Sequence, residues 1–470
     1  MQVLILGAGR VGGSLADKLI EQGEDVTIVD SDLRRLDELG RRLDVKRVHG
    51  NAAHPDVLQE AGAYDAESVF ATTGADEINM VASQICYTLF EVTNIVARVR
   101  TPAYLERRSE LFSFEHLPIK AAVNPELEMA EELCLVVQHP DARQALNLGA
   151  NSLRVCAFDV PVGWTHIGKQ VRDLAQAAGR LFVVPLIGRS KSGFVPTHDE
   201  RLAVGDTLFI LARAGDISTV MKNLELQGKP FKRVMIAGGG HLGARLVRAL
   251  QERTSASVRL IEVREDRCQK LAEELSCVVL CGDMTDERFL LEENIEHVDA
   301  FFALANSDES NLLASSIARR NKTRSVAALV LRPEMREIAG YAGATLVVSP
   351  VDAAVDAFRS YFRRGRVLRE HSLGENLGKV MEIEALGTAD TSELIGRAAL
   401  DIELPGGAKI FATARQGKSG GFKGRLLDRD LLIKQNDRVV VFVPQQSSDQ
   451  ALVRVQKDIE QVFRAPPRAF

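Results

Sequence analysis

Short apolar runs alternate with longer amphipathic segments along most of the chain. In the first half, the apolar runs predict strands near residues 2–7, 25–30, 45–49, 67–71, 94–99 and 120–123. Segments with helical periodicity fill the gaps, each about 10 to 15 residues long, and one of them is Asp76–Phe90. Because strands that alternate with helices form parallel sheets with right-handed crossovers, this half is predicted to be a Rossmann-like, doubly wound α/β domain.

The pattern of strands and helices occurs twice along the chain. The opening segment MQVLILGAGRVGG recurs as FKRVMIAGGGHLGA at residues 231–244. Further matched pairs follow in the same order: DVTIVDSD and VRLIEVRE, VHGNA and VLCGDM, VFATTGADEINM and FFALANSDESNL, and IVARVR and ALVLRP. A period of about half the chain is too long for a solenoid, so the sequence predicts a duplicated pair of domains.

After each Rossmann-like domain the sequence changes to short strands separated by turns. The first such segment contains LRVCAFDV, LFVVPLIG and DTLFILAR, with a helix expected after residues 164–168. The second contains VMEIEAL, KIFATAR and RVVVFVP. Each half is therefore predicted to end in a small α+β module, and the four domains are expected at residues 1–123, 140–225, 231–350 and 370–455.

Composition narrows the functional classes. The chain has 470 residues and a formal net charge of -5, so nucleic-acid binding has little electrostatic support. No apolar run approaches the roughly 20 residues of a membrane span, and the start MQVLILGAGR lacks the basic residues of a signal peptide, so we expect a cytoplasmic protein. The six cysteines form no metal-binding pattern, and all six are expected to be small buried side chains.

The first candidate nucleotide site is the glycine-rich turn after the first strand. Gly7, Gly9 and Gly12 form a G-x-G-x-x-G sequence between a strand and a helix, which is the context of a dinucleotide-binding fingerprint. Gly7 permits the turn, Gly9 lets a pyrophosphate approach, and Gly12 allows close helix packing. Asp30, at the end of the second strand, can bind both ribose hydroxyls, which favours NAD over NADP and suits ATP or ADP equally well.

The second half repeats this arrangement. Gly238, Gly240 and Gly243 form the glycine-rich turn, and Glu262 occupies the position of the acid. A second nucleotide pocket is therefore predicted. Arg264 follows the acid closely and either accommodates a 2′-phosphate or is a solvated surface arginine.

Further candidates lie where other strands end, because the carboxyl ends of parallel strands face the ligand crevice. In the first half these residues are Asn51, Ala52, Thr72, Thr73 and Arg98, with Arg100 as a weaker candidate. In the second half they are Asp283, Met284, Leu304, Ala305 and Arg332. Arg98 and Arg332 each close an apolar strand, so each needs a partner, either a ligand phosphate or a carboxylate on a neighbouring helix.

No recognisable catalytic set accompanies the candidate pockets. A hydride-transferring enzyme needs an acid, a base or an activating cation that faces the nicotinamide, whereas His166 and His198 lie in separate loop-like segments. We therefore expect a regulatory protein, with an NAD-dependent oxidoreductase as the alternative. The segment 358–369, FRSYFRRGRVLR, is locally basic and is either a partner or lipid-headgroup contact or a solvated helix end, and the tail RAPPRAF is expected to fray.

Several of these segments resemble a known family. The fingerprints GAGRVG with Asp30 and GGGHLG with Glu262, the segments TTGADEINM and NSDESN, and the Ile-Gly and Gly-Asp turns of the small modules are similar to tandem RCK domains, the regulators of potassium conductance. The resemblance covers nearly the whole chain and extends to the peripheral subunits of bacterial Trk potassium-uptake systems. It implies a subunit that binds NAD(H) and ATP or ADP, forms a tetrameric ring, and regulates a membrane channel of the TrkH or TrkG type. A tandem nucleotide sensor of a different ion transporter is the alternative.

The resemblance also implies which residues line each pocket. In the first pocket they are Gly7, Ala8, Gly9, Arg10, Val11, Gly12, Asp30, Thr72, Thr73 and Arg98. In the second they are Gly238, Gly239, Gly240, His241, Leu242, Gly243, Glu262, Leu304, Ala305 and Arg332. Because Asn51 corresponds to Asp283, and Leu304 with Ala305 replace the paired threonines, the two pockets are expected to differ in nucleotide preference.

Overall fold

Two compact units make up the chain in this computed structural model. One consists of Met1–Met129 with Ser349–Phe362, and the other of Ala130–Val348 with Arg363–Phe470. The structure describes residues 2–140, 142–332, 334–362, 367–374, 376–388, 391–392, 394–417 and 420–463. The tail RAPPRAF and residues 363–366 of the basic segment 358–369 lie outside the described residues.

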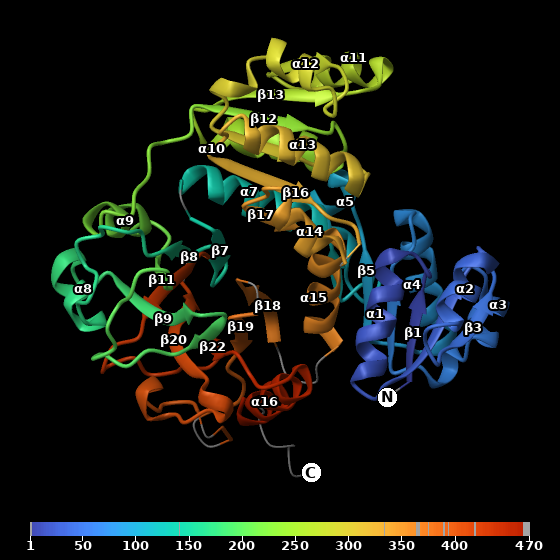
Figure 1. The fold of residues 1–470 in the computed structure, drawn as a ribbon. Coiled ribbons are helices and arrows are strands. Elements are labelled where there is room, and N and C mark those ends of the chain that lie inside the picture. Colours follow the sequence, from blue (N-terminus) through green and yellow to red (C-terminus); the bar gives the residue numbers. More distant parts are fainter. Residues whose placement is uncertain are drawn as a thin grey trace. The chain divides into compact units, whose positions relative to one another are not determined.

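The first unit is built on a parallel six-stranded sheet with the order β3-β2-β1-β4-β5-β6 (Figure 1). Its strands are β1 Gln2–Leu6, β2 Asp25–Asp30, β3 Lys46–His49, β4 Ser68–Ala71, β5 Ile95–Arg98 and β6 Ala121–Val123. All six strands were predicted from the sequence to within one residue at each end. The strand order reverses between β1 and β4, which creates the crevice where such sheets bind ligands.

Helices cover both faces of this sheet. Those that follow its strands in the chain are α1 Arg10–Glu21, α2 Leu33–Gly40, α3 Pro55–Glu60, α4 Asp76–Phe90, α5 Pro102–Glu106 and α6 Arg108–Leu111, with a 3-10 turn η1 at Ala63–Asp65. Helix α15, Pro350–Phe362, comes from the second half of the chain, and its Val351, Ala354 and Phe358 share a buried core with α1 and β1. The Phe358 ring meets the Phe70 ring edge to face, with centroids 5.6 Å apart. The first sheet is thus completed by a helix that follows the second sheet in sequence.

The second parallel sheet repeats the order of the first, as β14-β13-β12-β15-β16-β17. Its strands are β12 Arg233–Ala237, β13 Ser257–Glu262, β14 Val278–Cys281, β15 Ala300–Ala303, β16 Ser325–Leu329 and β17 Leu346–Val348. The helices are α10 His241–Arg253, α11 Glu265–Glu274, α12 Glu287–Glu292, α13 Asp308–Arg320 and α14 Met335–Tyr341, with the 3-10 turn η2 at Ile295–His297. The predicted duplication is confirmed. Among the described residues, no helix is long and apolar enough to cross a membrane.

Helix α7, Pro125–Gln138, follows β6 and ends against α10 of the second sheet. The Cys134 thiol donates to the Ala249 carbonyl at 3.6 Å, and Arg253 at the end of α10 pairs with both carboxylate oxygens of Glu131, at 2.5 and 2.7 Å. The second sheet is therefore flanked by a helix that follows the first sheet in sequence, the counterpart of α15.

The two small modules share one antiparallel topology. The antiparallel sheet of the first module has the order β10-β9-β11-β8-β7, and that of the second module has the order β21-β20-β22-β19-β18. The strands of the first module are β7 Gln144–Leu148, β8 Leu153–Asp159, β9 Phe182–Arg189, β10 Ser192–Phe194 and β11 Thr207–Arg213, and its helices are α8 Val171–Ala178 and α9 Ile217–Asn223. The second module has β18 Val367–Leu373, β19 Gly378–Glu384, β20 Lys409–Gln416, β21 Phe422–Leu426, β22 Arg438–Pro444, the helix α16 Asp449–Val462 and the 3-10 turns η3 Ala399–Asp401 and η4 Pro405–Gly407.

The two modules pack on each other through one buried core. Leu148, Val155 and Phe209 of the first module share this core with Val380 and Phe442 of the second. A buried carboxylate adds a polar contact, since Glu382 accepts a hydrogen bond from the Gly149 amide at 3.0 Å. Burial raises the pKa of Glu382. The small modules are therefore paired within a single chain.

A buried histidine after α7 makes the stability of this region dependent on pH. His139 Nε2 lies 2.9 Å from Arg154 Nη1, and burial, followed by the arginine charge, lowers the pKa of His139 from 6.5 to about 4. The folded state favours neutral His139, so its stabilising contribution is complete above pH 6.5 and is lost as the pH falls towards 4. We expect a loss of about 2 kcal/mol in the free energy of unfolding at pH 5.

The change His139→Gln tests this expectation, because the glutamine oxygen can still accept from Arg154 and does not titrate. Urea unfolding at pH 7 and pH 5 should show a smaller pH dependence for His139→Gln than for the wild type. His198→Gln, at an exposed position, is the control. Equal pH dependence in all three proteins would contradict the assignment.

Candidate functional site

The glycine-rich turn between β1 and α1 is shaped by two close backbone approaches. Gly7 has φ of +110°, in the left-handed region that favours glycine, and its amide donates to the Val29 carbonyl at 2.7 Å. A Cβ on Gly12 would overlap the Gly7 carbonyl oxygen. By contrast, a Cβ on Gly9 would meet nothing within 4 Å, and no side chain caps α1 at Gly9. The turn is thus closed by Gly7 and Gly12 and open to an anion at Gly9.

Asp30 ties the end of β2 to this turn. Its Oδ2 accepts from the Ala8 amide at 2.6 Å and its Oδ1 from the Asp32 amide at 2.8 Å. The side chain is buried. Asp32 caps α2 by accepting from the Arg34 amide, so the capping role belongs to Asp32 and not to Asp30. Because a carboxylate has about four acceptor sites, Asp30 retains acceptor capacity for ribose hydroxyls at the open side of the turn.

The second turn has the same construction with a longer acid. Gly238 has φ of +118°, and a Cβ on Gly243 would overlap the Gly238 carbonyl oxygen. Glu262 Oε2 accepts from the Gly239 amide at 3.1 Å, and its Oε1 accepts from the Arg264 amide at 3.1 Å. The Arg264 side chain is exposed, with its Nε 3.7 Å from Glu262 Oε1. This arginine is solvated and lies next to the acid.

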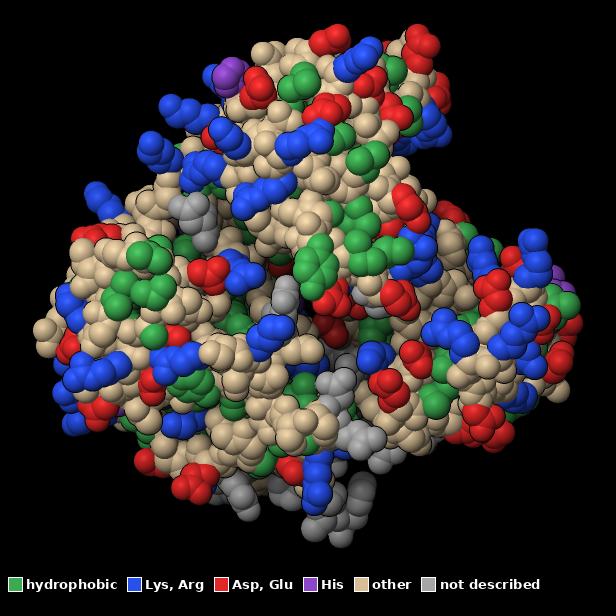
Figure 2. Space-filling view, in the orientation of Figure 1, with side chains coloured by type: hydrophobic (Ala, Val, Ile, Leu, Met, Phe, Trp, Pro, Cys, Tyr) green, Lys and Arg blue, Asp and Glu red, His purple; other side chains and the backbone are tan. Residues whose placement is uncertain are grey.

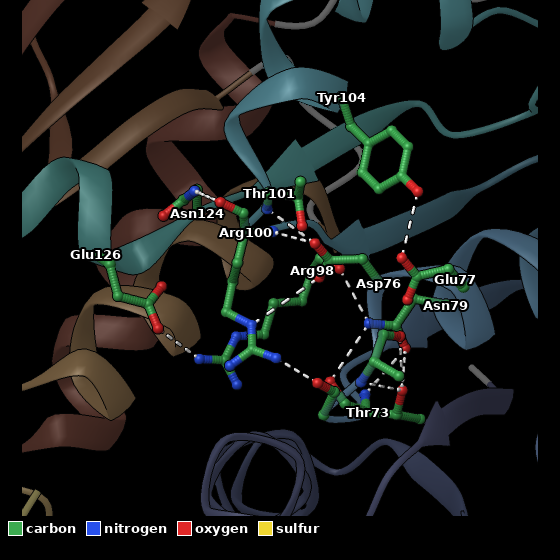
Figure 3. Close-up of polar contacts among 12 residues, drawn as sticks. Thr73, Asp76, Glu77, Asn79, Arg98, Arg100, Thr101, Tyr104, Asn124 and Glu126 are labelled. Carbon is green, nitrogen blue, oxygen red and sulfur yellow. Dashed lines mark hydrogen bonds and ion pairs between the residues drawn. The ribbon is translucent and has the colours of Figure 1, made fainter. Parts of the chain in front are cut away.

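The ends of β4 and β15 are fixed by asparagines that the sequence interpretation missed. Asn79, buried on α4, accepts from the Thr73 amide at 3.0 Å and donates to the Arg98 carbonyl at 2.9 Å (Figure 3). Asn311, at the equivalent position of α13, accepts from the Ala305 amide at 2.9 Å and donates to the Leu329 carbonyl at 2.8 Å. Each asparagine therefore joins two neighbouring strand ends.

The threonine pair of the first pocket has no polar counterpart in the second. Thr72 is buried and its hydroxyl donates to the Leu6 carbonyl at 3.1 Å, while the Thr73 hydroxyl donates to Asn79 Oδ1 at 2.6 Å. Leu304 is buried and Ala305 is half-buried at the matching positions. The two strand ends therefore offer different surfaces to a ligand.

Buried aspartates hold the loops after β5 and β16. Asp76 accepts from the amides of Arg100 and Thr101 at 3.0 and 2.8 Å, and Arg100 donates to the Gly74 carbonyl. Asp308 accepts from the amides of Leu331 and Arg332 at 2.7 and 3.2 Å. The residues missed here carry a sequence signal, because Asp76 with Asn79 and Asp308 with Asn311 share the spacing D-E-x-N.

Both arginines predicted to close a strand pair with helix carboxylates, but only Arg98 ends a strand, β5, whereas Arg332 lies three residues after the end of β16 at Leu329. Arg98 Nη2 lies 2.8 Å from Glu126 Oε1 at the start of α7, and both side chains are largely buried (Figure 3). Arg332 pairs with Asp308 at 2.9 Å and with Glu309 at 2.5 Å, and these hydrogen bonds raise the pKa of Arg332. The carboxylate partners predicted as one of two alternatives are therefore present, and Arg98 Nε remains buried without a partner among the described residues.

The remaining predicted residues lie at the same strand ends. Asn51 and Asp283 are exposed, and each accepts from the amide two residues later, at 3.0 and 2.8 Å, so the asparagine-to-aspartate difference changes charge and not the turn. Ala52 and Met284 are buried beside them. Arg10 and His241 are exposed at the first positions of α1 and α10, and Val11 and Leu242 are buried just after them.

The TrkA-N domain model matches residues 3–125 and 234–350. The chain is 34% identical over 469 residues, 99% of each chain, to Trk system potassium uptake protein TrkA of Vibrio alginolyticus. The chain belongs to the TrkA family. This TrkA-family chain is also 34% identical over 466 residues, 99% of each chain, to the protein of the same name from Halomonas elongata.

Solved RCK structures have the same fold. The crystal structure of the GsuK RCK domain matches 97% of this TrkA-family chain and 94% of its own chain, with a TM-score of 0.61 and 17% identity. A structure of the GsuK channel bound to NAD matches 97% of this chain and 78% of its own, with a TM-score of 0.61 and 16% identity. The predicted fold of duplicated Rossmann-like domains with small RCK modules is confirmed. As a member of the TrkA family, the chain is a regulatory potassium-uptake protein and not an oxidoreductase.

Proposed function

We propose that this chain binds NAD(H) and ATP or ADP in its two Rossmann-like pockets, and that binding gates a membrane potassium channel of the TrkH or TrkG type. The observation that carries the proposal is the acid beside each open glycine turn. Asp30 accepts from the Ala8 amide and Glu262 from the Gly239 amide, so each carboxylate is held where an adenosine ribose would lie. The GsuK channel bound to NAD, which has the same fold, supports this placement.

The two pockets differ in ways that favour different nucleotides. The second pocket has the longer acid Glu262, and it presents Leu304 and Ala305 where the first presents Thr72 and Thr73. A hydroxyl can donate to a ligand oxygen and an alkyl group cannot, so the second pocket provides fewer polar contacts at this edge. We therefore propose that the two pockets bind different adenine nucleotides.

The Arg98–Glu126 ion pair gives ligand binding a route to the rest of the chain. A nucleotide phosphate near Arg98 would compete with Glu126, and Glu126 lies in the first turn of α7, whose other end pairs with Arg253 of α10. A ligand shifts such an equilibrium only by its different affinities for the two states, so gating requires that the nucleotide bind one arrangement of α7 more tightly.

The distribution of surface charge favours a membrane-protein partner over a nucleic acid. On the face shown in Figure 2, Lys and Arg side chains are interspersed with Asp and Glu. A nucleic-acid interface needs a continuous basic surface. We further propose a tetrameric ring at the inner face of the cell membrane, which light scattering of the purified protein would test.

Calorimetric titration with NAD, NADH, ATP and ADP tests the nucleotide sites. Removing a charge-assisted hydrogen bond to the ribose is expected to weaken one site by about 10- to 100-fold, so Asp30→Ala should affect one set of nucleotides and Glu262→Ala the other. Asp32→Ala is the matched control, because it removes a charge from the same strand end without touching the turn. Potassium flux through vesicles that contain the channel partner should then respond to the nucleotides.

Two outcomes would overturn the proposal. If the wild type binds none of the four nucleotides, both glycine-rich turns have a structural role only. Tight binding that leaves potassium flux unchanged would remove the gating role.

A further inference from the structure

Two cysteines contact the backbone of the acid in the second pocket. Cys281 ends β14, the edge strand, and pairs in register with Glu262 of β13. Cys268 lies on α11, and its thiol donates to the Glu262 carbonyl at 3.2 Å. The Gly282 amide donates to the same carbonyl at 3.0 Å. Both cysteines are therefore part of the support that holds Glu262 at the glycine turn.

Cys268 and Cys281 lie beside the same residue, Glu262, which brings the two thiols into one neighbourhood. Burial raises the pKa of Cys268, and a hydrogen bond with the Cys281 thiol raises it further. Cys281 is exposed, whereas Cys268 is only 7% exposed. The expectation that all six cysteines are buried is therefore wrong for Cys281, which ends an edge strand and faces solvent, and for Cys277, which is half-buried. Cys281 is accessible to a small disulfide, and Cys268 lies close enough to serve as the resolving thiol.

The first pocket has no equivalent pair. The positions that correspond to Cys268 and Cys281 are Leu36, which is buried in the core, and His49, which pairs in register with Asp30. His49 Nε2 lies 3.1 Å from the Ser31 carbonyl oxygen. An effect that requires this pair of cysteines is therefore confined to the second pocket.

We propose that Cys268 and Cys281 form a reversible disulfide that lowers nucleotide affinity at the second pocket. The Cys281 thiolate attacks a low-molecular-weight disulfide and releases one small thiol, which leaves a mixed disulfide on Cys281. Cys268 then loses its proton, attacks the Cys281 sulfur and releases the second small thiol. The two protein thiols lose two electrons, and the small disulfide is reduced to two thiols that take up the two protons.

The disulfide changes the pocket through α11. Oxidation removes the Cys268 proton that is donated to the Glu262 carbonyl, and it ties α11 to the end of β14. Arg267, next to Cys268 on α11, donates to the Gly239 carbonyl at 2.7 Å. A movement of α11 therefore disturbs both the acid and the glycine turn. This consequence rests on the proposed nucleotide binding, whereas disulfide formation does not.

The disulfide itself is tested on the purified full-length chain in glutathione buffers of rising oxidised fraction. After alkylation and digestion, mass spectrometry should show a peptide pair linked through Cys268 and Cys281, which dithiothreitol reverses. Cys277→Ser is the matched control, because Cys277 is half-buried just before β14 and should not affect the linkage. In Cys268→Ala, Cys281 should stop at the glutathione adduct. An adduct on Cys281 of the wild type without the internal link would overturn the proposal.

The effect on the pocket is tested in the Asp30→Ala background, where binding reports the second pocket. Calorimetry with ATP and with NADH should show affinity about tenfold lower after oxidation, as expected for one lost hydrogen bond at the site. The Asp30→Ala/Cys268→Ala protein should show no such change. Equal affinity before and after formation of the disulfide would overturn the regulatory effect. If the reduced Asp30→Ala protein binds neither nucleotide, the proposed function of the second pocket fails, while mass spectrometry still decides the disulfide.

Discussion

Replacing Gly12 with alanine is expected to abolish nucleotide binding at the first pocket and to lower the free energy of unfolding by about 3 kcal/mol. The added Cβ would overlap the Gly7 carbonyl oxygen and come within 2.7 Å of the Thr72 hydroxyl. Gly7 cannot move away easily, because its amide is bound to Val29 and its backbone is already left-handed. The close approach of α1 to the turn therefore depends on the absence of a side chain.

Gly9→Ala is the matched control for Gly12→Ala. Gly9 has φ of -68°, which alanine adopts freely, and its Cβ would meet no atom within 4 Å. We expect thermal unfolding of Gly9→Ala to match the wild type while nucleotide binding weakens, because the methyl group lies where the pyrophosphate approaches. If Gly12→Ala unfolds like the wild type and binds nucleotide, the turn is not closed as described.

Replacing Phe442 with alanine should lower the free energy of unfolding by about 4 kcal/mol. The side chain is fully buried in the core that joins the two small modules, and its ring meets the Phe411 ring edge to face at 5.6 Å. Because residues of both modules line this core, the cavity should destabilise both modules. Limited proteolysis should therefore cut β8 and β11 of the first module as well as β19 and β22 of the second.

Phe422→Ala is the control for Phe442→Ala. Phe422 lies at the edge of the same core and is half-buried under the Arg438 guanidinium, 4.2 Å from the ring centroid. Its loss should cost about 1 kcal/mol, measured by urea unfolding of both variants. Proteolysis of the second module alone in Phe442→Ala would show that the modules are stabilised independently.

The parallel sheets could be predicted almost strand by strand, because buried strands are short, apolar and bounded by turns. Strand β1 follows this pattern, and so does its repeat β12, each running into a glycine turn. The assignment of α15 to the first sheet could not be predicted. Its apolar face indicates that it packs on something, but an amphipathic pattern does not name the surface.

The parts of the candidate site that depend on a short sequence motif could be predicted. Asp30 and Glu262 follow their glycines at the spacing of a known fingerprint, and the structure places both beside the turn. Asn79 and Asn311 were missed because their role depends on strand ends that are distant in sequence. Asn79 reaches the Arg98 carbonyl 19 residues away, and only the folded sheet brings the two together.

The exchange of α7 and α15 between the two halves has a consequence for the gene. Each parallel sheet packs against a helix that follows the other sheet in the sequence. Phe358 of α15 packs in the core of the first sheet, and Cys134 of α7 contacts α10 of the second. A half-length product would therefore leave α1 or α10 uncovered, and two such products could complete each other by exchanging these helices. Within one chain the same exchange is made internally, so the two pockets need not share one sequence.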